Sequence, residues 1–478
     1  MKVVLFILLL IVVLIAVVLI RTLTLKETSA KTAKIELDTS ARADEYAQTL
    51  AKMIRKETIS DRYNDDRTKF YEFHELLEEL FPNIHNVCEK HVFDGSLLFK
   101  WSGKGKHDPI LFMSHHDVVE ANGEWEHAPF SGDIDENGNV WGRGTVDTKA
   151  SLFCELTAVE ELIKEGYVPE CDVYIASSCT EEISGQGAPM TVQYLKEQGV
   201  KLAYLMDEGG MILEEPVGGV KGIYGVVGVL EKGYGDVKFT AHGAGGHASA
   251  PGKNTPLVRL GKFMVDVEKH NPFKKQFNPT AKEMFRRMAP NMVFYMKMIF
   301  ANMWLFEGLL SKILSSISSA GGAMIQTTLA FTNAQRSEGF NVLPQEAWVT
   351  GNMRYIPHQD SEESIALIAK IAKKYDIETE VIYKDSACPV VDYNGAPFKL
   401  VEAVAAEVYP GVGICPYVMT GGTDAKYYSS VSENCIRFAP LYIDDQQYAS
   451  IHGLNENIYQ GALPMGVDFY KTIIKKSK

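Results

Sequence analysis

Residues 109–117 read Pro-Ile-Leu-Phe-Met-Ser-His-His-Asp, a short apolar run that ends in polar side chains. Two further apolar runs end in the same way, Val173–Ala176 before Glu181-Glu182 and Leu202–Met206 before Asp207-Glu208. Helical stretches separate these runs, so the pattern predicts an α/β fold with a central, mostly parallel sheet. In such sheets the chemistry gathers at the carboxyl ends of the strands, where these polar residues lie.

Two further clusters have the same character, a Gly-rich turn that leads to Asp147 and a late Ser-Ile-His452. On a strand His115 and Asp117 share one face, so Asp117 can hold the ring of a metal-binding His115. Each cluster alone also suits a surface pair or an ordinary turn. Together, mixed His, Asp and Glu ligands without a thiolate favour a hydrolytic zinc site. Three carboxylates and two imidazoles hold two cations if one carboxylate bridges, and such a pair activates water.

The composition is that of a globular protein of two or three domains, with 478 residues, 46% of them hydrophobic and 23% charged. A net charge of −13 argues against nucleic acid as a partner, because a phosphate backbone selects basic surfaces. The seven cysteines are scattered and form no CxxC pair. We therefore expect buried thiols and not a disulfide framework.

Residues 3–20 form an unbroken apolar run, near the lower limit for a membrane span but long for a signal peptide. The best cleavage site, Thr28-Ser29-Ala30, lies well beyond its end. We therefore predict an uncleaved single-pass anchor over residues 1–21 in preference to a cleaved signal, followed by a stalk over residues 22–40. Basic residues after the run favour a cytoplasmic main body, but large domains are also exported against such a bias, so the side of the membrane stays open.

The sequence pattern changes between residues 233 and 385, where strand-like segments surround a helix at 361–374. We predict a catalytic domain in two parts, 41–232 and 386–478, interrupted by this second domain. Within it Phe285–Ile317 is long, apolar and rich in methionine. Two interpretations are open, an amphipathic lid helix packed on its own domain and a surface that faces lipid or binds an acyl chain.

The motifs resemble those of a known family, with His115-x-Asp117, Gly142-Arg-Gly-x-x-Asp147-x-Lys149, Glu181-Glu182, Asp207-Glu-Gly and His452 in order. This is the zinc metallopeptidase family of carboxypeptidase S, aminoacylase, carnosine dipeptidase and succinyl-diaminopimelate desuccinylase. The resemblance covers roughly residues 45–478. Trp125-x-x-x-Pro-Phe130, Gly246-His247-Ala-Ser and Asn341-Val-Leu-Pro favour the branch of carboxypeptidase S and the N-fatty-acyl-amino-acid synthase/hydrolases. The resemblance implies a catalytic domain interrupted by an α+β, ferredoxin-like lid and dimerisation domain.

The resemblance also implies two zinc ions, for which cobalt or manganese could substitute. Asp147 would bridge them, and the peptide bond after it would be cis. Glu182 and His452 would complete one site. His115 and Asp207 would complete the other.

Catalytic and substrate-binding roles follow from the same resemblance. Glu181 would be the general base, and Asp117 would orient His115. His247 would reach the scissile carbonyl, often from the partner subunit of a homodimer formed through the lid. Arg354 would grip the substrate carboxylate, for which a guanidinium fork is well shaped. The supporting contacts would come from Asn341, Gly421, Gly422 and Thr423.

We therefore predict a membrane-anchored dizinc hydrolase that cleaves an amide next to a free α-carboxylate. Its substrate would be a small peptide with a free carboxyl terminus or an N-acyl amino acid. One alternative is a dipeptidase or aminopeptidase of the same fold, which would need an acidic group in place of Arg354. Another is a non-catalytic membrane-anchored binding protein, against which the retention of Glu181 and all five ligands argues.

Overall fold

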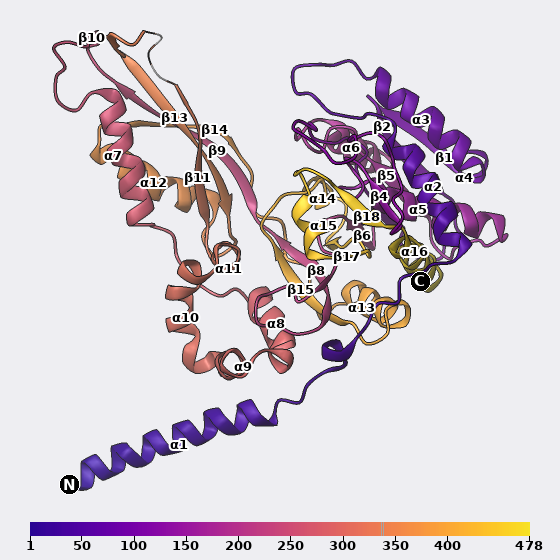
Figure 1. Ribbon diagram of the computed structural model, residues 1–478, viewed down its shortest axis with the longest axis horizontal. Helices are drawn as coiled ribbons and strands as arrows, with labels where there is room; N and C mark the ends of the chain where they lie inside the picture. Colours follow the sequence, from indigo (N-terminus) through magenta and orange to yellow (C-terminus); the bar gives the residue numbers. More distant parts are fainter. Residues whose placement is uncertain (336, 338) are drawn as a thin grey trace.

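The computed structural model describes residues 1–335, 337 and 339–478 (Figure 1). In this part of the chain the catalytic domain is built on a 10-stranded mixed sheet whose central strands β5, β3, β6 and β16 are parallel. The α/β class is thus confirmed. The strands lie in the order β1 (Glu89–Phe93), β2 (Ser96–Trp101), β5 (Val173–Ser177), β3 (Ile110–Met113), β6 (Tyr204–Asp207), β16 (Cys435–Arg437), β8 (Ile223–Glu231), β7 (Ile212–Glu214) and β17 (Tyr442–Ile443), with β15 (Gly413–Met419) beside β8.

Helices cover both faces of this sheet, which explains why its strands are unbroken apolar runs. Ile110 and Phe112 of β3 face one core, and Leu111 and Met113 face the other. The first core is formed with α2 (Ala41–Ile54), α3 (Thr68–Leu80), α4 (Pro82–Val87), α5 (Lys149–Lys164), α13 (Ala396–Val408) and α16 (Leu463–Lys476). The second is formed with α6 (Gly187–Glu197) and α14 (Ala425–Tyr428).

A small ribbon brings the end of the chain to the Gly-rich turn. In it β4 (Asn139–Trp141) pairs antiparallel with β18 (Asn457–Tyr459), and the short helix α15 (Asp445–Ser450) precedes β18. His452 lies between α15 and β18 and adopts a positive φ of 57°. This pairing is the reason why a histidine near the carboxyl terminus reaches Asp147.

The lid domain has a four-stranded antiparallel sheet in the order β11 (Thr328–Gln335), β13 (Glu346–Tyr355), β9 (Gly233–His242) and β14 (Glu378–Lys384). Helices α7 (Pro256–Lys269) and α12 (Ser361–Lys374) pack on it. The order of elements is βαββαβ, the ferredoxin-like arrangement expected from the resemblance. Both connections to the catalytic domain lie side by side, because the Asp385 amide donates to the Tyr234 carbonyl at 2.7 Å.

The Met-rich segment lies within a run of four helices, α8 (Pro279–Met288), α9 (Phe294–Ala301), α10 (Met303–Ile317) and α11 (Ser319–Ala323). Its buried side chains, Phe285 and Met288 among them, share a core with Tyr224 and Val226 of β8 and with Val418 of β15. The buried face of the segment therefore packs on the catalytic sheet and not on the lid sheet, which corrects the first interpretation. The connectivity places the segment in the lid, but its buried side chains share a core with the catalytic domain.

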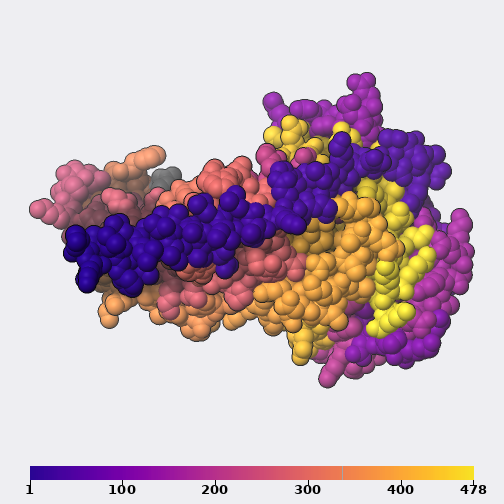
Figure 2. All heavy atoms as spheres, turned by 90° about the horizontal axis from the view of Figure 1, so that it is seen from below, coloured from indigo at the N-terminus to yellow at the C-terminus, as the bar shows by residue number. Residues whose placement is uncertain are grey.

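The apolar amino terminus forms one helix, α1 (Lys2–Thr24), long and apolar enough to cross a membrane and almost entirely exposed. It lies beneath α9 in Figure 1, and Figure 2 shows it across the underside of the molecule. Its last turns are attached to the Met-rich segment, because Asn302 donates from Nδ2 to the Val18 carbonyl at 3.3 Å and to Thr22 Oγ1 at 3.2 Å.

All seven cysteines lie in the described part and are buried free thiols, as expected. Burial raises the pKa of Cys171 to about 11 and that of Cys88 and Cys179 to about 12. It also raises the pKa of Cys388 and Cys415 to about 12. These side chains therefore behave as small apolar core residues.

Candidate active site

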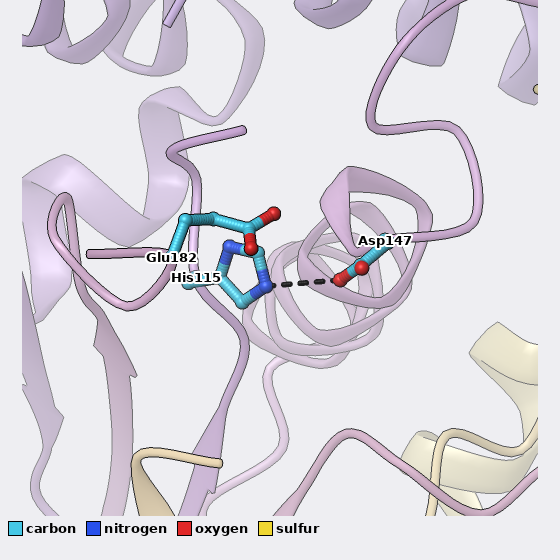
Figure 3. A group of neighbouring side chains, drawn as sticks. All are labelled: His115, Asp147 and Glu182. Atoms are coloured by element: carbon cyan, nitrogen blue, oxygen red, sulfur yellow. Dashed lines mark hydrogen bonds and ion pairs between the residues drawn. The ribbon is translucent and has the colours of Figure 1, made fainter. Parts of the chain in front are cut away.

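Asp147 stands at the centre of the site, at the end of the Gly-rich turn between β4 and α5. Its peptide bond to Thr148 is cis, as the resemblance implies. Its Oδ1 lies 3.0 Å from Nε2 of His115 (Figure 3), and its Oδ2 lies 2.9 Å from Nε2 of His452. The two oxygens of one carboxylate thus face two different imidazoles. This is the arrangement that a bridging ligand between two cations requires.

Glu182 extends the His452 side of the site. Its Oε2 lies 3.2 Å from Nε2 of His452, and its carboxylate lies near His115 in Figure 3. The other oxygen, Oε1, is buried and has no hydrogen-bond partner among the described residues. A buried carboxylate oxygen without a donor is destabilised unless a cation meets it, so the donor set fits a metal ion.

The two neighbouring acids after β6 differ in their surroundings. Glu208 Oε1 lies 3.3 Å from Nε2 of His115, and His115, Glu181 and Glu208 form a second group able to hold a metal. Asp207, the predicted ligand, instead accepts from the Glu208 amide and from the Ala425 amide, both at 2.8 Å. The geometry therefore favours Glu208 over Asp207 as the acid beside His115.

Asp117 is fully buried and connects two strand ends. Its carboxylate oxygens accept from the amides of Glu181 and Glu182, both at 3.1 Å. Nδ1 of His115 lies 2.8 Å from the Asp117 carbonyl oxygen and 3.5 Å from its carboxylate. Asp117 thus contacts the His115 ring mainly through its backbone, while its side chain positions the two glutamates.

Glu456 holds the Gly-rich turn in place, a role that the sequence did not indicate. One carboxylate oxygen accepts from the amides of Val146 and Asp147 at 2.8 and 3.0 Å. The other accepts from the Gly144 amide at 3.1 Å and from Arg143 Nη1 at 2.8 Å. The only available signal was its position four residues after His452, which identifies no partner.

The site concentrates more buried acid than base. Burial raises the pKa values of Glu181, Glu182 and Glu208, and it raises the pKa of Asp207 to about 6. Hydrogen bonds to Asp147 and Glu182 raise the pKa of His452 to about 10. Burial thus disfavours the charged form of these acids, and bound divalent cations would stabilise that form.

A cavity beside Glu181 and Glu182 is lined by residues of both domains. Arg354 of β13 lies over the Tyr234 ring, 4.6 Å from its centroid. It lines this cavity, of about 320 Å³, together with Glu181, Glu182 and Gly422. Gly421, Gly422 and Thr423 also line the adjoining cavity around Asp147.

The loop that carries these glycines is held by a buried side chain at the end of β8. Thr423 donates from its amide and from Oγ1 to Glu231, at 3.3 and 3.1 Å. Glu231 in turn pairs with the fully buried Arg437 at 2.9 Å. The buried ion pair therefore fixes the loop between the catalytic sheet and these two cavities.

Two predicted residues lie elsewhere. His247 and Asn341 are exposed at the end of the lid, where β10 (Gly246–His247) pairs with β12 (Val342–Leu343). Figure 1 shows this ribbon at the end of the lid remote from the catalytic domain. The backbone carbonyl of Asn341 accepts from the Ala248 amide at 2.9 Å, so His247 and Asn341 are neighbours. Neither is among the residues that line the cavity around Asp147.

Comparison with known proteins identifies the family. The model of peptidase family M20/M25/M40 matches residues 111–476. A probable carboxypeptidase S-like 2 from Dictyostelium discoideum is 30% identical, over 91% of this chain and 85% of that protein. The N-fatty-acyl-amino acid synthase/hydrolase PM20D1 of Xenopus tropicalis is 32% identical, over 91% of this chain and 86% of its own.

A solved structure has the same fold. The M20 family metallo-carboxypeptidase Sso-CP2 from Sulfolobus solfataricus superposes with a TM-score of 0.67 at 18% identity, over 90% of this chain and 99% of that one. The resemblance noted from the motifs is thereby confirmed. The chain belongs to the M20/M25/M40 peptidase family, and it is an enzyme of the metallopeptidase and amidohydrolase type.

Proposed function

We propose that this chain is a two-metal hydrolase that cleaves an amide bond next to a free α-carboxylate. The observation that carries the proposal is Asp147, whose two oxygens face His115 and His452 in a cavity that adjoins Arg354. The substrate would be a peptide carboxyl terminus or an N-acyl amino acid. The names of two relatives, a carboxypeptidase S-like protein and an N-fatty-acyl-amino acid synthase/hydrolase, agree with this class.

The metal ligands fall into two groups around Asp147. His452 and Glu182 would hold one zinc ion, and His115 with Glu208 would hold the other. Bound there, the pair of cations would polarise the scissile carbonyl and lower the pKa of a water molecule. Asp117 and Glu456 would fix the ligand-bearing turns through the backbone amides described above. Cobalt or manganese could occupy the same oxygen and nitrogen ligands.

Glu181 would move the proton in this reaction. It lines the cavity beside Glu182 and Glu208, and burial raises its pKa, which suits a group that takes up a proton and returns it. Its carboxylate would accept a proton from the attacking water as the new carbon–oxygen bond forms. It would then pass that proton to the amide nitrogen as the carbon–nitrogen bond breaks.

The carboxylate end of the substrate would lie at Arg354. Arg62 and Lys426 line the same cavity, and Glu231 on its wall is already paired with Arg437. Asp385 lines the cavity as well, but the cationic side chains Arg62, Arg354 and Lys426 favour a substrate anion over the amine that an aminopeptidase or dipeptidase must bind. His247, exposed at the end of the lid, would reach the carbonyl only from a second subunit, which favours a homodimer through the lid.

We also propose that α1 remains attached as a single-pass anchor. Arg21 and Asn302 join its last turns to the α9–α10 junction, contacts that a cleaved signal would not make. Helices α9 and α10 expose Phe294, Tyr295 and Trp304, which suit a membrane interface.

Metal content tests the ligand set. Purified protein should carry close to two divalent ions per chain by elemental analysis, and Asp147→Ala should lose most of both because it removes the shared ligand. Glu208→Gln should lose about one ion, whereas Asp207→Asn, its neighbour with the matched change, should keep both. One ion in the wild type would rule out the two-metal site, and the reverse pattern in the pair would restore Asp207 as the ligand.

Turnover of Glu181→Gln tests the general base. The substitution keeps the shape of the side chain but cannot accept a proton, so kcat should fall by roughly 10²-fold or more while metal content stays unchanged. A metal-loaded variant with wild-type kcat would assign the proton transfer to another group.

Arg354→Ala tests carboxylate recognition. A charge-assisted hydrogen bond contributes about 1.5–3 kcal/mol, so kcat/KM on free-acid substrates should fall roughly tenfold to a hundredfold. Arg354→Lys keeps the positive charge but loses the two-pronged guanidinium group. Its kcat/KM should lie between the values of the wild type and of Arg354→Ala. Amidated analogues should be poor for the wild type and unaffected by either change. Equal cleavage of amidated and free-acid substrates by the wild type would favour the aminopeptidase or dipeptidase alternative.

The anchor is tested on protein made in cells. The protein should resist extraction from membranes at alkaline pH, and the mass of the intact chain should include residues 1–30. A mature chain that begins after Ala30 would show that the segment is a signal peptide.

A further inference from the structure

A second cavity, of about 460 Å³, adjoins the catalytic one and has a different character. Its wall is formed mainly by apolar side chains of α8–α11 and β8, including Met284, Phe285, Met288, Met296, Phe300 and Leu314. The acids on its lining are Glu215, which pairs with Lys221 at 2.6 Å, and Asp445 at the start of α15. Its volume is in the range of small-molecule sites.

This apolar cavity continues into the catalytic cavity. Gly209, Tyr417, Thr420 and Tyr448 line both. Gly209 follows Glu208, has a φ of +123°, and a Cβ there would lie 2.5 Å from the Cε of Met419. A glycine is therefore required where the two spaces meet.

The catalytic cavity lies between the cavity of Arg354 and the apolar cavity, and the three differ in the side chains that line them. The cavity of Arg354, which also holds Arg62 and Lys426, shares Glu181, Glu182 and His452 with the catalytic one, whereas it shares no described lining residue with the apolar cavity. A ligand that spans the three cavities must have an anionic end, a central group that reacts near Asp147 and an apolar end. An amino acid with a long N-acyl chain has this order of groups.

We propose that the apolar cavity binds the aliphatic tail of the substrate's N-acyl group. This inference rests on the proposed function, since it presumes that the amide is cleaved beside Asp147. Methionine side chains adapt to a flexible chain, which suits an unbranched alkyl tail better than a compact side chain. The tail would enter at Ile317 and Ala320, on the side of the molecule where α10 exposes Trp304 and Leu309.

A chain-length series tests the assignment in the full chain, reconstituted in phosphatidylcholine nanodiscs with N-acyl-leucines from acetyl to palmitoyl. Each methylene buried in the cavity contributes ~0.8 kcal/mol, so kcat/KM should rise about fourfold per added methylene until the cavity is full. Hydrolysis of acetyl-leucine with no rise along the series would overturn the cavity assignment alone. No hydrolysis of any acyl-leucine would overturn the proposed function as well.

Two pairs of substitutions at exposed positions test whether the acyl chain occupies the mouth of the apolar cavity. Ala320→Trp narrows the mouth and Ile317→Asp places a charge there, whereas Ser319→Trp and Ser316→Asp make the same changes at adjacent positions that do not line the cavity. The first two should lower kcat/KM for palmitoyl-leucine roughly tenfold or more and leave acetyl-leucine within about twofold. The two controls should match the wild type on both substrates. Equal losses in mouth and control variants, or equal losses on both substrates, would overturn the proposal.

Discussion

The burial of carboxylates at the ends of β3, β5 and β6, and on the turns before α5 and β18 that meet them, is the constraint on which the rest of this site depends. A buried carboxylate must be met by backbone N–H donors or by positive charge. The carboxylates of Asp117, Glu456 and Asp207 accept hydrogen bonds from backbone amides. Asp147, Glu182 and Glu208 face imidazoles instead. The second group therefore has the composition of a metal site, and the first group holds it in shape.

The fold distributes the functions of the site among separate structural units. The parallel centre of the catalytic sheet presents the acids and imidazoles, while the lid strand β13 carries Arg354 to the cavity beside Glu181 and Glu182. Strands β8 and β15 support the opposite side, where the Met-rich helices pack. Arg354 therefore reaches the cavity from a lid strand, while the Met-rich helices, although they lie between lid strands in the sequence, pack on the catalytic sheet.

The sequence predicted those features that depend on local periodicity. Alternation of Ile110 and Phe112 with Leu111 and Met113 follows from strand geometry, and the polar residues after each run mark the edge where the site lies. The sequence suggested Asp207 as the acid beside His115, whereas the geometry favours Glu208. Local periodicity does not distinguish the two, because β6 ends at Asp207 and alternation no longer applies beyond it.

Features that depend on distant partners were also beyond prediction. Glu456 bonds to a turn far away in the chain, so no local pattern could assign its role. For residues 285–317 the apolar pattern indicated that a face is buried, but periodicity cannot say against which domain it packs. The position of His247 in a site could not be derived from one chain, because the residue lies at the end of the lid.

The buried thiols have a consequence for where this protein can be made. A cysteine with a pKa near 12 is almost entirely protonated at neutral pH, and the thiolate is the form that oxidants attack. With all seven cysteines buried as free thiols in the described structure, the native fold needs no oxidant to form and exposes little for one to modify. The same folded domain is therefore compatible with a reducing cytosol and with an oxidising lumen.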